Sequence, residues 1–364
     1  MTMTVHAAVA RSAIEPLRIE EVQLRAPGPG EVLVQMKASG ICHSDLSVWQ
    51  GKLPLPLPMI LGHEGAGIVL ECGSGVDNVR PGDHVILNNV PECGECACCR
   101  SPKTNYCNEI DAGRAQGSPF SLNGEVMRTM SRGATFATHT VLRDYYLTPI
   151  PRDMPFASAA LVSCGVMTGV GSALFTARVD AGSTVVVFGM GSIGLNAVQG
   201  ARLAGAGRII AVDTQPAKEA SALRFGATDF LLAGADASPV DAAIRALLGG
   251  PADYAFECVG SPALMRMALS LVHPHWGVCL AIGITPYDQD ITLPGSSFYL
   301  GRSMRGTFIG DGKPRTETPR LLQWYREGKL LLDELVSHRL GLEQINDGFD
   351  LMRRGAAIRS VIEY

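Results

Sequence analysis

The sequence predicts an α/β protein that combines a mostly β domain with a doubly wound parallel sheet. Two patterns support this prediction. Short alternating apolar segments separated by Gly- and Pro-rich turns fill the first part of the chain, and from about residue 184 apolar strands alternate with helical segments. The chain has 364 residues, which suffices for two domains because single cores stop growing at about 250–300 residues.

The composition is that of an ordinary globular protein, with 46% hydrophobic and 18% charged residues. The formal net charge of -4 provides no basic surface for nucleic acid. No apolar run is long enough to span a membrane, and the N-terminus lacks the charged-then-apolar order of a signal peptide. We therefore expect a cytoplasmic protein without nucleic-acid or membrane partners, whose clustered cysteines bind metal rather than form disulfides.

The N-terminal part is expected to form short strands. Residues 31–37 alternate apolar and polar side chains after a Pro-Gly-Pro-Gly turn, and 67–70 and 83–87 continue the pattern. Residues 108–135 are polar, rich in Gly and without periodicity, so we expect a loop that is functional or forms a contact surface.

This β domain contains a candidate catalytic zinc site between Cys42 and Glu64. A thiolate (Cys42) and an imidazole (His63) are ligand types that zinc favours, and a carboxylate is their usual neighbour. A catalytic zinc needs a third protein ligand and an open fourth position, and Cys164 is the candidate. The alternative is that Cys42 and Cys164 are small buried hydrophobic residues, as most free cysteines are.

A CxxCxxCx7C pattern predicts a structural zinc site in a lobe at about residues 91–108. Its members are Cys93, Cys96, Cys99 and Cys107. Four thiolates at such spacing enclose one tetrahedral zinc and leave no open position. Disulfides and an iron–sulfur cluster are the alternatives, but no compartment signal supports the first, and the bacterial ferredoxin spacing ends differently. Cys98 is expected to stay outside the site.

The second domain begins with a dinucleotide fingerprint. The apolar run 184–188 predicts a strand buried on both faces, and it leads into the GxGxxG turn 189–194 and a helix that continues to Ala204. A second strand, 208–213, ends in Asp213 at the spacing that the fingerprint requires. The glycines allow the backbone to approach a pyrophosphate at the positive end of the helix.

Strands and helices continue to alternate up to the end of the chain. We expect helices at 217–225, 241–248 and 263–272, and strands at 230–232, 254–258, 278–282 and 304–309. With the first two strands these complete a six-stranded doubly wound sheet. The tail is expected to pack on the N-terminal domain, with helices at 319–327 and 342–353 and strands at 335–338 and 357–362.

Together these motifs resemble the zinc-containing medium-chain alcohol dehydrogenases, in particular their long-chain dimeric branch, over essentially the whole chain. The matching motifs are Cys42, Gly62-His63-Glu64, the four-cysteine lobe, Ser163-Cys164-Gly165 and the fingerprint that ends in Asp213. The resemblance implies a GroES-like catalytic domain at 1–166 and 309–364 and a Rossmann coenzyme domain at 167–308. It also implies an NAD-dependent homodimer with two zinc ions per chain that interconverts small alcohols and aldehydes.

The resemblance also implies roles for individual residues. Cys42, His63 and Cys164 would bind the catalytic zinc. Asp45 would support His63, and Glu64 would lie close behind the metal. The residues expected at the cofactor are His43, Thr168, Gly189, Gly191, Ser192, Ile193, Gly194, Asp213, Lys218, Ile282, Ile284 and Arg359.

Within this set, Thr168 and Ile193 would flank the nicotinamide. His43 and Arg359 would face the pyrophosphate, and Asp213 and Lys218 would hold the adenosine ribose. For the three cationic side chains, His43, Lys218 and Arg359, the alternative is a solvated surface charge.

The chemistry implied for this site is hydride transfer from a zinc-bound alkoxide to nicotinamide. Ser44 is the candidate first acceptor of the alcohol proton, although a serine there can also serve as a helix cap or in a turn. Family members place a histidine five residues after the first zinc cysteine, at the outer end of the proton relay. This chain has Ser47 there, so the proton must leave through water or another group.

The predicted substrate is an apolar primary alcohol and its aldehyde, with aromatic alcohols included. The pocket is expected to contain Trp49, Leu53 and Asn89. Glutathione-dependent formaldehyde dehydrogenases of this family carry an acid where this chain has Leu53 and a base where it has Asp111, so we expect no glutathione-recognition charges.

Three alternatives remain open for the function. One is a polyol or threonine dehydrogenase, although that branch often has glutamate in place of Cys164. The second is a glutathione-dependent formaldehyde dehydrogenase. The third is a non-enzymatic, crystallin-like NAD(P)-binding protein, although such relatives usually lack the catalytic zinc ligands.

Overall fold

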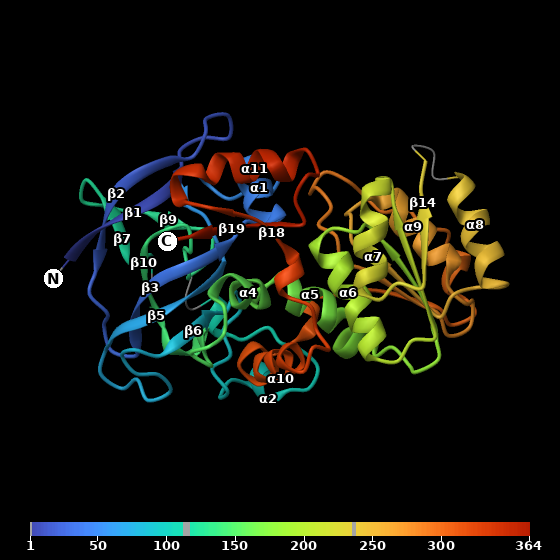
Figure 1. Ribbon diagram of the computed structural model, residues 1–364, viewed down its shortest axis with the longest axis horizontal. Coiled ribbons are helices and arrows are strands. Elements are labelled where there is room, and N and C mark those ends of the chain that lie inside the picture. The colour runs from blue at the N-terminus through green and yellow to red at the C-terminus, as the bar shows by residue number, and fades with distance from the viewer. Residues whose placement is uncertain (1, 112–116, 235–237) are drawn as a thin grey trace. The chain divides into compact units, whose positions relative to one another are not determined.

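The computed structural model describes residues 2–111, 117–234 and 238–364, and this part of the chain divides into two compact units (Figure 1). Unit 1 comprises Met1–Cys164 and Lys313–Tyr364, and unit 2 comprises Gly165–Gly312. The boundaries between the units lie after Cys164 and after Gly312. The boundaries predicted from the sequence lie after residues 166 and 308.

The first sheet of unit 1 has the strand order β8-β7-β2-β1-β4-β9. Its strands are β1 Thr2–Ala10, β2 Arg18–Arg25, β4 Met59–Ile60, β7 Phe120–Leu122, β8 Glu125–Val126 and β9 Arg128–Thr129. The prediction of an uninterrupted loop at 108–135 is therefore wrong where β7, β8 and β9 lie. Strands of two or three residues are too short to show alternation. They form because β7 pairs with β2, β8 pairs with β7 and β9 pairs with β4.

The second sheet of unit 1 has the order β11-β6-β5-β3-β19-β18, and β10 also pairs with β3. Its strands are β3 Glu31–Gly40, β5 Glu64–Cys72, β6 His84–Leu87, β10 His139–Arg143, β11 Leu147–Ile150, β18 Val336–Leu340 and β19 Arg359–Glu363. The C-terminal strand β19 runs antiparallel to β3, with Val361 opposite Gly40. The tail thus completes a sheet whose other strands come from the start of the chain.

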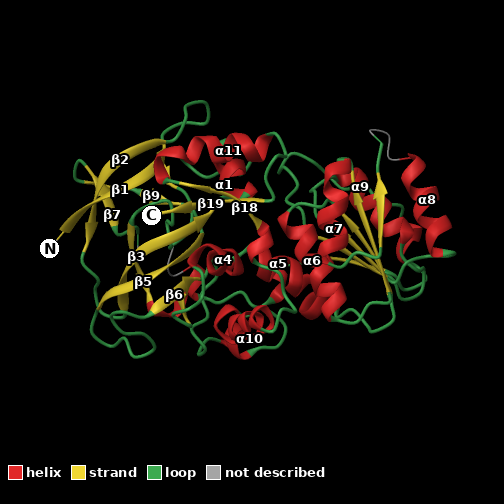
Figure 2. Ribbon diagram, viewed as in Figure 1, coloured by secondary structure: helices red, strands yellow, loops and turns green. Residues whose placement is uncertain are grey.

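The helices of unit 1 are α1 His43–Trp49, α2 Ala97–Arg100, α4 Phe156–Ala160, α10 Pro314–Arg326 and α11 Ile345–Arg353. Helix α4 contacts β3 and β5, and α11 contacts β19 (Figure 2). The sequence did not predict α1, and it predicted the start of α10 at Pro319 instead of Pro314. Pro314 occupies the first turn, where proline is favoured, whereas Pro319 lies inside the helix.

Unit 2 is a parallel sheet with the order β14-β13-β12-β15-β16-β17, which is the doubly wound order expected from the fingerprint. Its strands are β12 Thr184–Phe188, β13 Arg208–Asp213, β14 Asp229–Leu232, β15 Tyr254–Glu257, β16 Val278–Ala281 and β17 Ser303–Gly306. The last strand was predicted to reach Ile309, but it ends at Gly306. Residues Ile309–Asp311 instead form a helical turn with Gly310 at φ +64°.

The helices of unit 2 are α5 Gly165–Gly171, α6 Ser192–Leu203, α7 Glu219–Phe225, α8 Ser238–Leu248 and α9 Pro262–Leu271. Helix α6 contacts α7, and α8 contacts α9. The sheet core consists of aliphatic and aromatic side chains such as Val186, Phe188 and Ile210, all buried. This explains why the strands are apolar runs without alternation.

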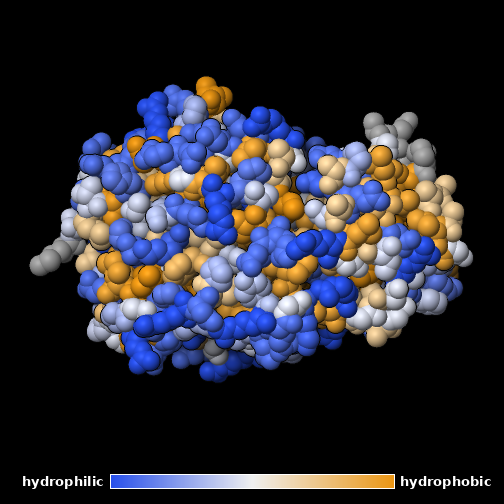
Figure 3. Space-filling view, viewed as in Figure 1, coloured by the Kyte–Doolittle hydropathy of each residue, from blue (hydrophilic) through white to orange (hydrophobic). Residues whose placement is uncertain are grey.

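No single described helix is long and apolar enough to span a membrane. The bent pair Phe156–Ser163 and Gly165–Ala177 passes the length and composition test only when its two parts are taken together, and most of its residues are buried. On the face in Figure 3, hydrophobic residues appear in small groups among hydrophilic ones.

Candidate active site

Four buried side chains of unit 1 place their ligand atoms within 4.8 Å of one another. They are Cys42, His63, Glu64 and Cys164. Cys42 directly precedes α1, His63 and Glu64 lie at the start of β5, and Cys164 follows a helical turn after α4. The fold therefore brings the sulfur of Cys164 close to Cys42 and His63, which are more than 100 residues away in the sequence.

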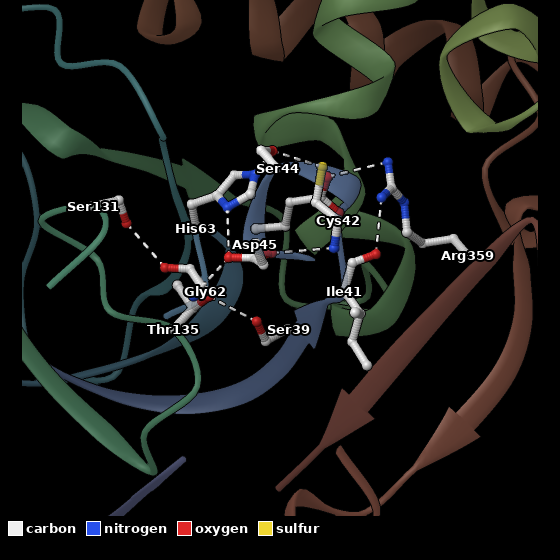
Figure 4. A network of polar contacts seen from close by, with 11 residues as sticks. Ser39, Ile41, Cys42, Ser44, Asp45, Gly62, His63, Ser131, Thr135 and Arg359 are labelled. Carbon is white, nitrogen blue, oxygen red and sulfur yellow. Dashed lines mark hydrogen bonds and ion pairs between the residues drawn. The ribbon is translucent and has the colours of Figure 1, made fainter. Parts of the chain in front are cut away.

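Asp45 holds the first two of these ligands in place (Figure 4). Its Oδ1 accepts hydrogen bonds from the Nδ1 of His63 at 3.2 Å and the backbone N–H of Gly62 at 2.9 Å. Its Oδ2 accepts from the backbone N–H of Cys42 at 3.1 Å. Because Nδ1 of His63 donates to this carboxylate, Nε2 keeps its lone pair for a metal.

Glu64 and Arg359 form a buried ion pair beside the ligand set. The Nη2 of Arg359 lies 3.2 Å from Oε1 of Glu64, and both side chains are nearly inaccessible. The Nη1 of Arg359 donates to the carbonyl oxygen of Ile41 at 2.9 Å. The guanidinium is thus directed at Glu64 and Ile41 rather than at solvent, which argues against a solvated surface charge.

The electrostatics of the cluster favour a bound cation. Contact with the Cys164 thiol holds the pKa of Cys42 well below its ordinary value. Burial raises the pKa of Glu64 to about 7, and neither Glu64 oxygen has a hydrogen-bond partner among the described residues. A divalent cation would satisfy these buried acceptors and ionise both thiols, so the donor set fits zinc.

The other residues expected near this metal differ in their surroundings. The Oγ of Ser44 lies 3.1 Å from Sγ of Cys42 and 3.5 Å from Nε2 of His63, so it is close to the ligand set. His43 is exposed, Leu53 is partly buried, and so is Asn89. The predicted contact of Trp49 with substrate gains no support. Its indole is buried in a core cluster and donates to the carbonyl oxygens of Ser12 and Glu15.

The cysteine lobe forms a second candidate metal centre. Cys93, Cys96, Cys99 and Cys107 also place their sulfurs within 4.8 Å of one another, and Cys98 is not part of this group. The backbone N–H groups of Cys96 and Cys99 donate to sulfurs of the cluster. Burial opposes ionisation of Cys96, but the backbone N–H groups of Asn108 and Cys99 outweigh it and lower the pKa of Cys96 to about 6. This arrangement fits a closed tetrahedral site.

The expected cofactor residues of unit 2 gather at the carboxyl ends of its strands. Gly189, with φ +89°, follows β12, and Gly191 precedes α6. A Cβ on Gly194 would lie 1.7 Å from the carbonyl oxygen of Gly189, so glycine is required there. Asp213 ends β13, and its carboxylate accepts hydrogen bonds from the backbone N–H groups of Met190 at 2.6 Å and Gln215 at 2.9 Å.

The remaining cofactor residues are less uniform. Ser192 and Thr168 are buried, and the carbonyl oxygen of Thr168 accepts a hydrogen bond from Ser172. Ile282 is buried, whereas Ile284 is exposed. Ile193 and Lys218 are partly buried.

Sequence reasoning missed two features. The pairing of Glu64 with Arg359 joins residues nearly 300 positions apart and left no local signal. Glu257 ends β15 with a fully buried carboxylate. An acid that closes an apolar strand, as Asp213 does, could have drawn attention to it.

Comparison with known proteins gives consistent matches along the chain. The family model "Alcohol dehydrogenase GroES-like domain" matches residues 28–152, and "Zinc-binding dehydrogenase" matches residues 192–327. The chain is 42% identical to an alcohol dehydrogenase class-3 of Cereibacter sphaeroides and 42% identical to an S-(hydroxymethyl)glutathione dehydrogenase of Paracoccus denitrificans, with 100% of each chain covered. Its structure is similar to that of benzyl alcohol dehydrogenase from Acinetobacter calcoaceticus, with a TM-score of 0.90 and 28% identity over 99% of each chain.

Proposed function

The chain belongs to the zinc-containing medium-chain alcohol dehydrogenase family and is an NAD-dependent zinc enzyme of that family, and we propose that its substrates are apolar primary alcohols and their aldehydes, aromatic ones included. The observation that carries the reaction type is the buried set of Cys42, His63 and Cys164 beside Glu64. Two thiolates and one imidazole form a catalytic zinc site of the type that leaves a position for substrate.

Each residue of the set has a defined task in this proposal. Zinc held by Cys42, His63 and Cys164 would lower the pKa of a bound alcohol, and nicotinamide would accept the hydride. Asp45 keeps His63 in the tautomer that binds metal. Ser44, whose hydroxyl lies beside Cys42 and His63, accepts the alcohol proton and passes it toward water. Asp213 would accept a hydrogen bond from the ribose 2′-OH and repel a 2′-phosphate, which favours NAD over NADP.

The substrate proposal rests on Leu53 and Asp111, two positions that differ from the charges expected in glutathione-dependent relatives. Leu53 packs against the apolar core cluster of unit 1, where glutathione-dependent relatives would present an acid. Asp111 is an acid where a base is expected in those relatives, and its carboxylate accepts a hydrogen bond from the Tyr106 hydroxyl. The similarity to a benzyl alcohol dehydrogenase is further support. An apolar pocket discriminates by about 1–3 kcal/mol per methylene, so we expect several substrates.

One observation favours a second candidate, S-hydroxymethylglutathione. The relative from Paracoccus denitrificans is named for that substrate and is 42% identical over the full length of both chains. Glutathione is polar, and a missing hydrogen-bonding group in the protein would cost far more binding free energy than a missing methylene contact in an apolar pocket. The two candidates therefore predict clearly different kinetics.

A kinetic comparison distinguishes the candidates. We would measure kcat/KM of the zinc-loaded enzyme for benzyl alcohol, hexanol, sorbitol and S-hydroxymethylglutathione with NAD in excess, and then repeat the first with NADP. We expect the two apolar alcohols to have the highest values and NAD to be preferred. A clear lead for S-hydroxymethylglutathione would replace the proposed substrate with the second candidate, and a lead for sorbitol would exclude both.

The setting of the enzyme is part of the same proposal. All ten cysteines are free, and six of them belong to the two candidate metal clusters. Thiolate metal sites need a reducing compartment, so we propose that the enzyme acts in the cytoplasm. We also propose a homodimer.

A further inference from the structure

Glu257 occupies the position in unit 2 where open α/β sheets bind their ligands. It is the last residue of β15 and pairs in register with Phe188 of β12 on one side and Ala281 of β16 on the other. The strand order reverses between β12 and β15. Crevices at such a switch point, at the carboxyl ends of the strands, hold the cofactor in doubly wound folds.

The Glu257 carboxylate is fully buried and holds the loop that follows it. It accepts hydrogen bonds from the backbone N–H groups of Val259 at 3.0 Å, Gly260 at 2.9 Å and Ser261 at 3.2 Å. Among the described residues no lysine or arginine forms an ion pair with it. Burial raises the pKa of Glu257, and these N–H groups oppose that effect. A buried charge balanced only by backbone dipoles is costly, so a merely space-filling role would be served better by an apolar residue.

The loop that Glu257 holds touches both neighbouring segments expected at the cofactor. A Cβ on Gly189, the first glycine of the fingerprint, would lie 2.7 Å from Cγ2 of Val259. Gly260, with φ +90°, packs so closely that a Cβ there would lie 2.4 Å from the carbonyl oxygen of Ile284. The backbone carbonyl oxygen of Glu257 itself accepts hydrogen bonds from Ile282 at 2.9 Å and Gly283 at 3.0 Å.

We propose that Glu257 is a positioning residue for the nicotinamide cofactor, whose carboxylate fixes the loop 258–261 between the glycine-rich turn and the segment 282–284. This inference rests on the proposed use of NAD. Displacement of the loop would move Val259 against Gly189 and Gly260 against Ile284, and so change the walls of the cofactor site from two sides.

The matched variants are Glu257→Gln and Asp253→Asn, because they change two carboxylates at opposite ends of the same strand. Asp253 precedes β15, and its carboxylate accepts hydrogen bonds from Thr184 and from the Trp276 indole. We would measure the Kd for NAD of the zinc-loaded enzymes by calorimetry, together with Tm and the split between KM for NAD and kcat. We expect Glu257→Gln to weaken NAD binding about tenfold or more, because an amide nitrogen would face backbone N–H groups. Asp253→Asn should lower Tm with the Kd unchanged.

The outcomes separate the inference from its premise. A wild-type enzyme that does not bind NAD would refute the proposed cofactor use. A wild-type enzyme that binds NAD, together with a Glu257→Gln variant whose Kd changes no more than that of Asp253→Asn, would overturn only the role of Glu257. Glu257→Asp keeps the charge and shortens the side chain by one methylene, so we expect an intermediate Kd. If Glu257→Gln does not fold, a Glu257→Asp variant with the wild-type Kd overturns the inference.

Discussion

The carboxylate of Asp45 accepts hydrogen bonds from three groups around the candidate catalytic zinc, namely the Cys42 N–H, the Gly62 N–H and the His63 imidazole. Asp45→Asn would replace one acceptor with a donor and disturb two zinc ligands together. We expect zinc affinity at this site to fall about 10–100-fold, measured as metal content after dialysis against a weak chelator. Asp83→Asn is the control, because Asp83 caps an exposed turn at Arg80. Unchanged zinc content in Asp45→Asn would contradict the role of Asp45.

The ion pair between Glu64 and Arg359 leads to a prediction about stability. Both side chains are at most 5% exposed, so removing one partner leaves an uncompensated buried charge. Arg359→Met should therefore lower the free energy of unfolding by about 3–5 kcal/mol, and adding Glu64→Gln should recover a large part of that loss. Denaturant unfolding of the two single variants and the double variant gives the coupling energy. Additive effects would mean that the pair does not interact.

At the residue scale, the sequence predicted ligand types better than partnerships. Cys42, His63 and Cys164 could be named because zinc chemistry restricts the choice to a few side chains, and the resemblance implied the same three ligands. The surroundings of Trp49 could not be predicted, because an apolar side chain that lines a substrate pocket and one that is buried in the core look the same in the sequence. The partner of Glu64 depends on where the distant strand β19 begins, and the sequence around Glu64 does not encode this.

Between elements, the cysteine lobe is tied to the start of α10. The Nζ of Lys313 donates to the carbonyl oxygen of Ser101 at 2.7 Å and also to that of Cys99. The backbone N–H of Thr316 donates to Glu92 at 3.0 Å. Cys99→Ser should weaken the four-thiolate site, whose metal contributes folding energy outright.

We therefore expect Cys99→Ser to increase hydrogen exchange in residues 313–318 together with the lobe, while β12 and β13 stay protected. Cys98→Ser is the matched control, since Cys98 lies outside the sulfur cluster. Increased exchange in the lobe alone would show that α10 does not depend on it.

The ion pair between the end of β2 and the start of β3 provides a prediction about pH. Arg25 at the end of β2 lowers the pKa of Glu31 at the start of β3. A lowered pKa means that Glu31 binds a proton less readily in the folded state than in the unfolded state. The ion pair therefore stabilises the protein above the ordinary glutamate pKa, and this stabilisation is lost as pH falls through the pKa of Glu31 in the folded state. Glu31→Gln should cost on the order of 1 kcal/mol at pH 7, discounted for screening because the Arg25 side chain is 44% exposed.

Below about pH 4 the difference in Tm between the Glu31→Gln variant and the wild type should shrink toward zero. Thermal unfolding at pH 7 and at acidic pH measures this. A difference that stays constant over the range would show that the effect is not electrostatic. Glu20→Gln, at the ion pair with Arg11, is a comparison at a second ion pair of unit 1.

At the level of elements, the long and strongly patterned segments were predictable. The buried strands β12 and β13 begin and end at the predicted residues. Glycine and charged residues next to an apolar run leave few possible positions for the ends of the strand. The strands β7, β8 and β9 could not be predicted, since their structure depends on pairing with β2, β7 and β4, respectively. The start of α10 was misplaced because Pro319 has the appearance of an N-terminal residue, while its i−4 carbonyl is simply left without a donor.

For the whole molecule, the strand order of unit 2 and the return of the tail to unit 1 followed from the sequence and the resemblance. Both depend on connectivity. Six strands joined by crossover helices allow few arrangements, and the tail strands β18 and β19, which are not needed for that sheet, join the second sheet of unit 1 instead. The assembly state does not follow from such rules. It depends on the surface that one copy offers to another.

The edge of the unit 2 sheet leads to a prediction for the homodimer. Among the described strands, β17 pairs only with β16, so its outer edge is open to pairing with a second copy about a twofold axis. Tyr299 and Leu300, which are 83% and 59% exposed, lie a few residues before this strand begins at Ser303. Exposed apolar side chains beside an open edge are typical of an interface between copies.

Leu300→Glu should place two like charges across such an interface and shift the protein toward monomer. The matched control is Leu232→Glu, because Leu232 is 54% exposed at the end of β14, the opposite edge strand. Sedimentation or light scattering over a range of concentrations would measure the dimer dissociation constant of each zinc-loaded variant. We expect it to rise about tenfold or more for Leu300→Glu and to stay at the wild-type value for Leu232→Glu. A larger effect of Leu232→Glu would assign the interface to the β14 edge, and a monomeric wild type would refute the homodimer itself.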